Sequence, residues 1–136
     1  MIRFSPMPSL ALPLPLAACV ATTSLYSDVS IAAADRAVTS AAAQVKRCYR
    51  DPVAPSAARY IVTRLRVHFA ADGTLIGLPR MVSQQGVTPS NQAYANRMAE
   101  AASLAIMRCS PLRLPVAAHR GGWDEFDLIF SHNALA

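Results

Sequence analysis

The sequence lacks the residue patterns on which most enzymes and metalloproteins depend. Its three histidines are scattered, and its three cysteines form no Cys-x-x-Cys pair or other metal-ligand spacing. It has neither a glycine-rich phosphate loop nor a motif that places a nucleophile beside a base. We therefore expect no catalytic residue, no metal, no cofactor and no small-molecule substrate. The chain is predicted not to be an enzyme, and a hydrolase has the least support of any function.

Charged residues are also scarce, at 15% of the chain, and aromatic residues make up only 7%. Basic residues outnumber acidic ones, which gives a net charge of +5 and a pI of about 9.6. This balance favours an acidic partner or an anionic lipid surface, and the alternative is that the charge serves only to keep the protein soluble. No basic cluster is interleaved with aromatic residues, so we expect no nucleic acid as a partner. The best candidate for a basic patch consists of Arg64, Arg66 and His68.

No hydrophobic run at the N-terminus is long enough to cross a membrane, because prolines interrupt it. Residues 1–18 carry one charge, Arg3, and end in small residues, as export signals do. Leu16-Ala17-Ala18-Cys19 resembles the lipobox of bacterial lipoproteins, in which the cysteine is acylated. The residue after Cys19 is Val20 rather than an aspartate, which resembles the lipoproteins that go on to the outer membrane. An ordinary cleaved signal, or no signal at all, are the alternatives. We predict a signal peptide over 1–18, a lipid on Cys19, a flexible tether over 19–30 and one domain over 31–136.

Two amphipathic stretches each end at a cysteine that is closely followed by proline, which cannot continue a helix. Ser90 stands where the second helix needs an N-cap. The predicted inward positions are Ile31, Ala34, Val38, Ala41, Val45 and Cys48 in the first helix, and Tyr94, Met98, Ala101, Ala105 and Cys109 in the second. Disulfides persist in oxidising compartments. If the chain is exported and Cys19 is lipidated, Cys48 and Cys109 are left as a pair.

The middle of the chain reads as a β-hairpin. Residues 60–70 alternate between apolar and polar side chains, with Ile61, Thr63, Leu65, Val67 and Phe69 on the predicted core face. Asp72-Gly73 supplies a tight turn, and residues 74–82 return as a less regular strand before a loop over 83–89. A last short strand begins near Phe126, and Trp123 before it is predicted to pack over the sheet rather than to stack on a ligand. The order is helix, strand, strand, helix, strand.

Residues from about 45 to 130 resemble the C-terminal domain of TolA and, more distantly, of TonB, which are envelope proteins of Gram-negative bacteria. The resemblance rests on the order and spacing of four motifs. These are Cys48-Tyr49-x-x-Pro52, Leu65-x-Val67-x-Phe69-x-x-Asp72-Gly73-Thr74, Cys109-x-Pro111-Leu112-x-Leu114-Pro115 and Trp123-x-x-Phe126-x-Leu128-x-Phe130.

The resemblance implies an α+β fold, with a three-stranded antiparallel sheet and helices packed on one face. It also implies a periplasm-facing module that binds other envelope proteins. The last strand is short and no long segment follows it, so we expect an open edge on which a partner adds a strand. The predicted partner-binding residues are Phe126, Asp127, Leu128, Ile129, Phe130 and Ser131. The alternative is a structural or peptidoglycan-associated lipoprotein that uses its basic face.

Overall fold

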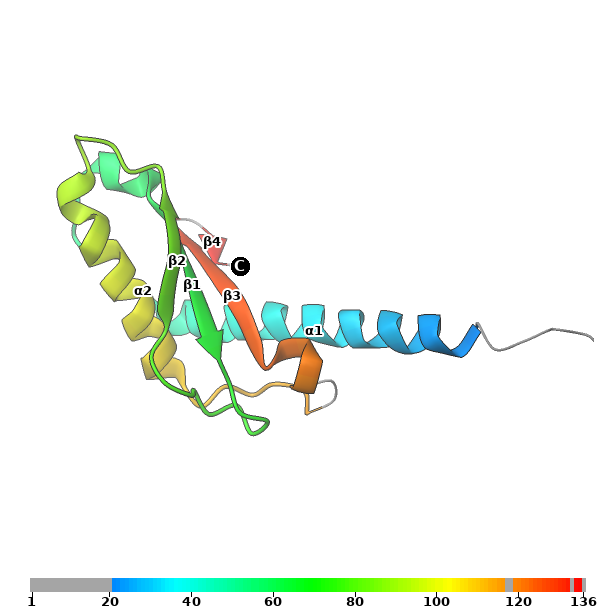
Figure 1. Cartoon of the computed structure of the whole chain (residues 1–136). Helices are drawn as coiled ribbons and strands as arrows, with labels where there is room; N and C mark the ends of the chain where they lie inside the picture. The colour runs from blue at the N-terminus through cyan, green and yellow to red at the C-terminus, as the bar shows by residue number, and fades with distance from the viewer. Residues whose placement is uncertain (1–20, 117–118, 133, 136) are drawn as a thin grey trace, which may run out of the picture.

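The computed structural model describes residues 21–116, 119–132 and 134–135. The chain forms an α+β fold in which two helices cover one face of an antiparallel sheet, as Figure 1 shows. The sheet has the strand order β2-β1-β3-β4. The helices are α1 (Ala21–Cys48) and α2 (Ala95–Cys109), and the strands are β1 (Val62–His68), β2 (Arg80–Gln85), β3 (Glu125–Ser131) and β4 (Ala134–Leu135). Short turns of helix, η1 (Ser56–Tyr60), η2 (Gln92–Tyr94) and η3 (His119–Trp123), join them.

Helix α1 is longer than the sequence predicts. Residues 21–30, expected as a flexible tether, form its first turns, because they contain no proline or glycine that would end the helix. A stripe of small residues, Ala33, Ala37 and Ala41, then packs against the rest of the domain. The prediction that Ile31 points inward is wrong, since its side chain is 61% exposed.

Helix α2 begins later than predicted. Ser90 does not cap it: α2 starts at Ala95 after the η2 turn, and the Ser90 hydroxyl contacts that of Thr88 instead. Asn91 organises this region, because its buried side chain accepts a hydrogen bond from the Thr88 amide and donates to two backbone carbonyls. The polar network therefore replaces the expected cap. The buried residues of α2 are Ala95, Met98, Ala102, Ala105 and Ile106.

Strand β1 confirms the predicted alternation, since all five residues expected on the core face are at most 1% exposed. The tight turn is also present. The amide of Gly73 donates to the Ala70 carbonyl, and Gly73 has a φ of 86°, which a side chain disfavours. The second strand lies further along than predicted, at 80–85 rather than 74–82, and is an edge of the sheet. Between the turn and β2, Gly77 also has a positive φ and Pro79 lacks an amide to donate, so regular pairing resumes only at Arg80.

The disulfide between Cys48 and Cys109 joins the ends of α1 and α2, as predicted. Both helices pack on one cluster with β1 and β3, in which Trp123 is fully buried, as expected for a core aromatic. Strand β4 was not predicted. It pairs with the C-terminal end of β3, with Ala134 opposite Ser131, so the expectation that nothing covers the last strand is wrong at that end.

Candidate binding edge and open sheet face

The hydrogen bond from the Phe69 amide to the Asp124 carbonyl shows which residues of β3 point their amide and carbonyl groups toward β1. These two residues continue the register of β1 and β3. Hydrogen-bonded and non-bonded pairs alternate along an antiparallel ladder, so every second residue of β3 faces β1 and the others face away. The residues facing β1 are Phe126, Leu128 and Phe130, and those facing the outer edge are Glu125, Asp127, Ile129 and Ser131.

Strand β4 takes up only the last part of this outer edge. It pairs with Phe130 and Ser131. Among the described residues, no strand pairs with Glu125 or Asp127 on the side away from β1. The six predicted partner-binding residues thus lie together on β3, but among its outward-facing residues only Glu125, Asp127 and Ile129 have no described strand beside them. Such an edge is a template for another strand.

The two faces of β3 differ in polarity. Leu128 and Phe130 are buried in the core cluster. Phe126 packs against this cluster, with its ring centroid 5.7 Å from that of Phe69. Glu125 and Asp127 lie on the opposite face of the sheet, which the helices leave uncovered. A segment added beside β3 therefore meets the apolar core cluster on one face of the sheet and charged side chains on the other.

The predicted basic patch lies on this open face, but carboxylate side chains of β3 offset its positive charge. The Nε of Arg66 donates to Oδ1 of Asp127 at 2.8 Å, and Arg64 lies 3.8 Å from the same carboxylate. Glu125 lies 3.6 Å from Arg66 and 3.5 Å from Nδ1 of His68. The hydrogen bond and charge of Asp127 raise the pKa of Arg66. Two carboxylates thus oppose two guanidinium groups, and the face is a cross-strand ion-pair network.

A signal for this network exists in the sequence. Arg64 and Arg66 alternate on one strand, and Glu125 and Asp127 alternate at the same spacing on another. Opposite charges in directly opposed positions stabilise a strand pair. Recognising them required knowing that β1 and β3 are neighbours, which the pattern within each strand does not show.

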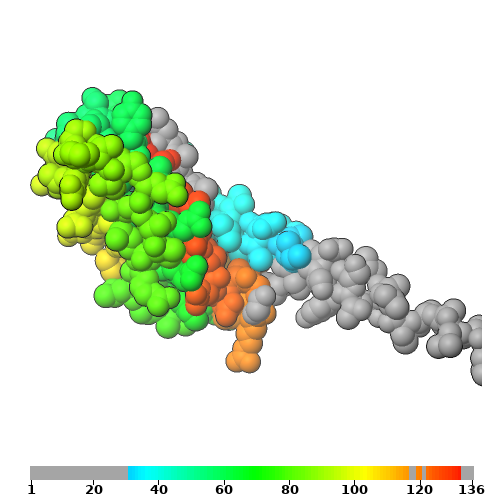
Figure 2. Space-filling view, turned by 45° about the horizontal axis from the view of Figure 1, so that its top comes forward, coloured from blue at the N-terminus to red at the C-terminus, as the bar shows by residue number. Residues whose placement is uncertain are grey.

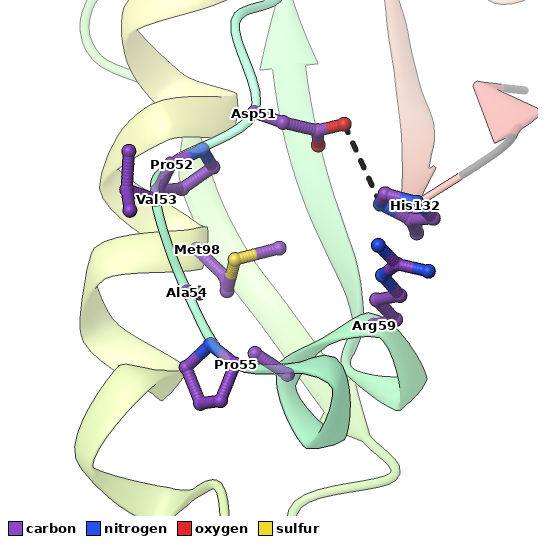
Figure 3. Close-up of a pocket in the computed structure, with 9 residues that line it drawn as sticks. Asp51, Pro52, Val53, Ala54, Pro55, Arg59, Met98 and His132 are labelled. Atoms are coloured by element: carbon purple, nitrogen blue, oxygen red, sulfur yellow. Dashed lines mark ion pairs between the residues drawn. The ribbon is translucent and has the colours of Figure 1, made fainter.

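Sequence reasoning also missed a cavity of about 230 Å³ between η1, α2 and the end of β3. Figure 3 shows Asp51 directed toward His132, whose Nδ1 is 3.4 Å from its Oδ2, with Arg59 close by. Met98 of α2 and Val53 supply apolar walls. Burial, together with Asp51, raises the pKa of the neighbouring Tyr49 to about 12. Apolar side chains and charged groups thus line the same cavity.

No group of three or more histidine, cysteine or carboxylate side chains in the described part of the chain has a metal-binding arrangement. Within the same residues, no helix has the length and apolar character needed to cross a membrane. Cys19, the predicted lipidation site, and the predicted signal peptide lie outside the described residues.

Residues 32–119 match the model of the family described as Uncharacterised conserved protein UCP034077. The chain belongs to this family. The matched region runs from residue 32 of α1 to the start of η3, and so includes the C-terminal part of α1, all of α2 and the β1–β2 hairpin but not β3. The chain matches no curated protein and no solved structure.

Proposed function

We propose that this chain is a periplasm-facing protein-binding module of the Gram-negative cell envelope, similar to the C-terminal domain of TolA and held at the outer membrane by a lipid on Cys19. Its partner is an envelope protein, an extended segment of which adds to the sheet beside β3. The observation that carries this proposal is the outward backbone of Glu125 and Asp127, which no described strand covers. Main-chain hydrogen bonds would supply affinity, and alternate side chains would supply selectivity.

Two features support the proposed location. A disulfide joins Cys48 and Cys109, and disulfides persist in oxidising compartments such as the periplasm. The apolar N-terminal run that ends in Ala17-Ala18-Cys19 is typical of exported chains. Both features are expected of an envelope lipoprotein.

The alternative function, adhesion to cell-wall polymers through the basic face, has less support. Arg64 and Arg66 are held by Asp127 and Glu125, so little positive charge is left for a polymer. Adhesion driven by charge weakens as salt screens it. Binding of purified cell-wall polymer that disappears at high salt, without any protein partner, would favour this alternative.

Photocrosslinking tests the proposed edge directly. A photoreactive amino acid at Ile129, on β3, is expected to crosslink an envelope protein in intact cells. The matched control places the same probe at Met81, a 55% exposed residue of the opposite edge strand β2. Mass spectrometry of the crosslinked peptides then identifies the partner and the contacted segment. Equal crosslinking from both edges, or crosslinking from β2 alone, would contradict the proposal.

A further inference from the structure

The two helices end side by side in a group of basic residues. The disulfide holds the Cα atoms of Cys48 and Cys109 5.8 Å apart, so the last turns of α1 and α2 lie together. Lys46 and Arg47 belong to the last turn of α1, and Arg108 belongs to that of α2. All three are exposed. The disulfide thus brings together cations from two distant segments of the chain.

Two more arginines extend this group beyond the helices. Arg50 follows Cys48 by two residues. Arg113 lies against α1, because the Gln44 side chain donates to its carbonyl and accepts from its amide, both at 2.8 Å. Arg47 follows Gln44 by three residues and so lies on the same side of α1. We call the five exposed residues Lys46, Arg47, Arg50, Arg108 and Arg113 the basic cluster.

The basic cluster keeps most of its positive charge. No aspartate or glutamate occurs in residues 36–50 or 101–123. None of the ion pairs between described residues includes a member of the cluster, and Asp51, which follows Arg50, pairs with His132 instead. Basic residues in a last helical turn offset the helix dipole, but two helix ends carry only about one negative charge in total. About four positive charges are therefore left for a partner.

Exposed apolar side chains flank the cluster. Met107 precedes Arg108 and is 37% exposed, and Val116 follows Arg113 by three residues and is 73% exposed. Cations beside exposed apolar side chains suit an anionic membrane, whose phosphates attract the cations while the apolar side chains enter the interface. The cluster is carried by helices and by the segments that leave them, so it offers an extended protein segment no strand edge to pair with. Lipid headgroups need no such edge.

The cluster also lies on the helix side of the molecule. The two helices cover one face of the sheet, as Figure 1 shows. In Figure 2 the other side is turned toward the viewer, with the green strands and the orange-red β3 at the surface and the cyan part of α1 emerging beyond β3. Contact through the helix side therefore leaves the open face and the outer edge of β3 accessible to a protein partner.

We infer that the basic cluster binds anionic phospholipid headgroups at a membrane surface. Its cations lie beside lipid phosphates, and Met107 and Val116 enter the interface. Helix α1 has 28 residues and is about 42 Å long, so a chain held by a lipid on Cys19, just before this helix, gains a second membrane contact near the helix's other end. The choice of a membrane rests on the lipid anchor of the proposed function, whereas strand addition at β3 is independent of it. Acidic polymers and acidic protein segments are the occupants that the inference excludes.

Sedimentation with lipid vesicles tests this contact in the exported full chain. The protein carries Cys19→Ser, so that no acyl chain contributes to binding. Vesicles of phosphatidylglycerol and phosphatidylcholine in equal parts are compared with vesicles of phosphatidylcholine alone. We expect the anionic vesicles to bind at least about tenfold more tightly at low salt, and high salt to remove most of this difference. Equal binding to the two kinds of vesicle would overturn the inference, as would binding of soluble polyglutamate without binding of anionic vesicles.

Charge-removing variants assign the binding to the cluster. The first replaces its three helical members, as Lys46→Gln, Arg47→Gln and Arg108→Gln. Each cation near an anionic surface contributes about fivefold, so this variant is expected to bind anionic vesicles about a hundredfold more weakly. The matched control removes the same charge from exposed arginines outside the cluster, as Arg59→Gln, Arg80→Gln and Arg97→Gln. Equal losses in the two variants would show that only the net charge matters and would overturn the inference.

A second variant leaves the basic residues of both helix ends in place. Arg50→Gln with Arg113→Gln is expected to weaken binding to anionic vesicles about 25-fold, and the backbone contacts of Arg113 with Gln44 need no arginine side chain. Thermal melting shows whether each variant is folded. If both cluster variants are folded and bind as tightly as the parent protein, the membrane contact lies elsewhere and the inference is wrong.

The two proposals fail separately. If the protein does not bind anionic vesicles but a probe at Ile129 crosslinks an envelope protein, the membrane contact is overturned and strand addition at β3 stands. If vesicles bind through the cluster but the probe at Ile129 crosslinks nothing, the membrane contact stands and the proposed partner site is overturned.

Discussion

Arg66 and Asp127 lie directly opposite each other on β1 and β3, and the Arg66 guanidinium donates from both Nε and Nη2 to the two oxygens of the carboxylate, at 2.8 and 3.3 Å. This pair lies at the centre of the open face, between Arg64 and Glu125. It joins two strands that are 61 residues apart in the sequence. Its effect on stability is nevertheless limited by its exposure to water.

The first prediction concerns that pair. The Arg66 side chain is 41% exposed, and exposed ion pairs contribute little because solvent screens them. Arg66→Met, which keeps much of the aliphatic length, is therefore expected to leave the midpoint of urea denaturation almost unchanged. Urea denaturation measures this change. A large fall in the urea midpoint would show that the network stabilises the sheet far more than exposed pairs do.

The second prediction is a loss of stability in strong alkali. Burial and the Asp51 carboxylate raise the pKa of Tyr49 to about 12 from its ordinary value of 10.0. The unfolded chain therefore releases this proton first, so the stability that Tyr49 contributes is complete below pH 10 and is lost as the pH rises toward 12. Tyr49→Phe has no hydroxyl to ionise and is expected to lose less stability over this range. Parallel denaturation curves of the two proteins against pH would contradict the assignment to Tyr49.

The third prediction concerns the disulfide. Cys48 and Cys109 enclose 61 positions of chain, and closing a loop of that size in the unfolded state is worth about 4 kcal/mol on the chain-entropy model. Replacing both cysteines by serine is expected to lower the free energy of unfolding by about that amount. Chemical denaturation of the oxidised protein, the reduced protein and the double variant measures it. If reduction has no effect on the denaturation midpoint, the bond contributes no net stability.

Much of the fold follows from local patterns in the sequence. Strand β1 alternates cleanly because it lies between two strands and over two helices, so every second side chain is buried. The two helices end at Cys48 and Cys109 as predicted. The position of β2 did not follow, because its side chains lie at an edge and carry little apolar alternation. Ser90 was misassigned because Asn91, rather than a helix cap, satisfies the nearby backbone groups.

Less of the candidate site was predictable. The residues of β3 were identified, but the charge pairing of Arg64 and Arg66 depends on the register between β1 and β3. The contact between Asp51 and His132 joins residues 81 positions apart. Neither arises from a periodic pattern within one segment. The cover of Ser131 by β4 was missed because two residues are too few to give a strand signal.

The fourth prediction concerns Cys19. If Cys19 is lipidated after removal of residues 1–18, an alkynyl fatty acid should label the wild-type protein in cells and should not label Cys19→Ser. The multiple acyl chains of a bacterial lipoprotein would hold the protein firmly, because each buried methylene contributes about 0.8 kcal/mol. Fractionation of the envelope should then release Cys19→Ser into the soluble periplasmic fraction. Equal labelling of both proteins, or of neither, would contradict lipidation at this residue.

The fifth prediction separates strand addition from folding. The amide of Ile129 points away from β1, so Ile129→Pro removes a donor from the outer edge while Leu128 and Phe130 keep their bonds to β1. We expect this variant to stay folded and to lose partner binding. Leu128→Pro, one residue earlier, removes a donor that faces β1 and is expected to lower the melting temperature sharply.

Ile129→Ala completes the comparison, because it shortens the half-buried side chain but keeps the backbone amide. If main-chain hydrogen bonds supply the affinity, Ile129→Ala should bind the crosslinked partner much more tightly than Ile129→Pro does. If both bind equally poorly, the side chain is what the partner recognises. A folded Ile129→Pro protein that binds as tightly as wild type would exclude addition at β3 and direct attention to the cavity beside Asp51 and His132, where η1 and the end of β3 meet.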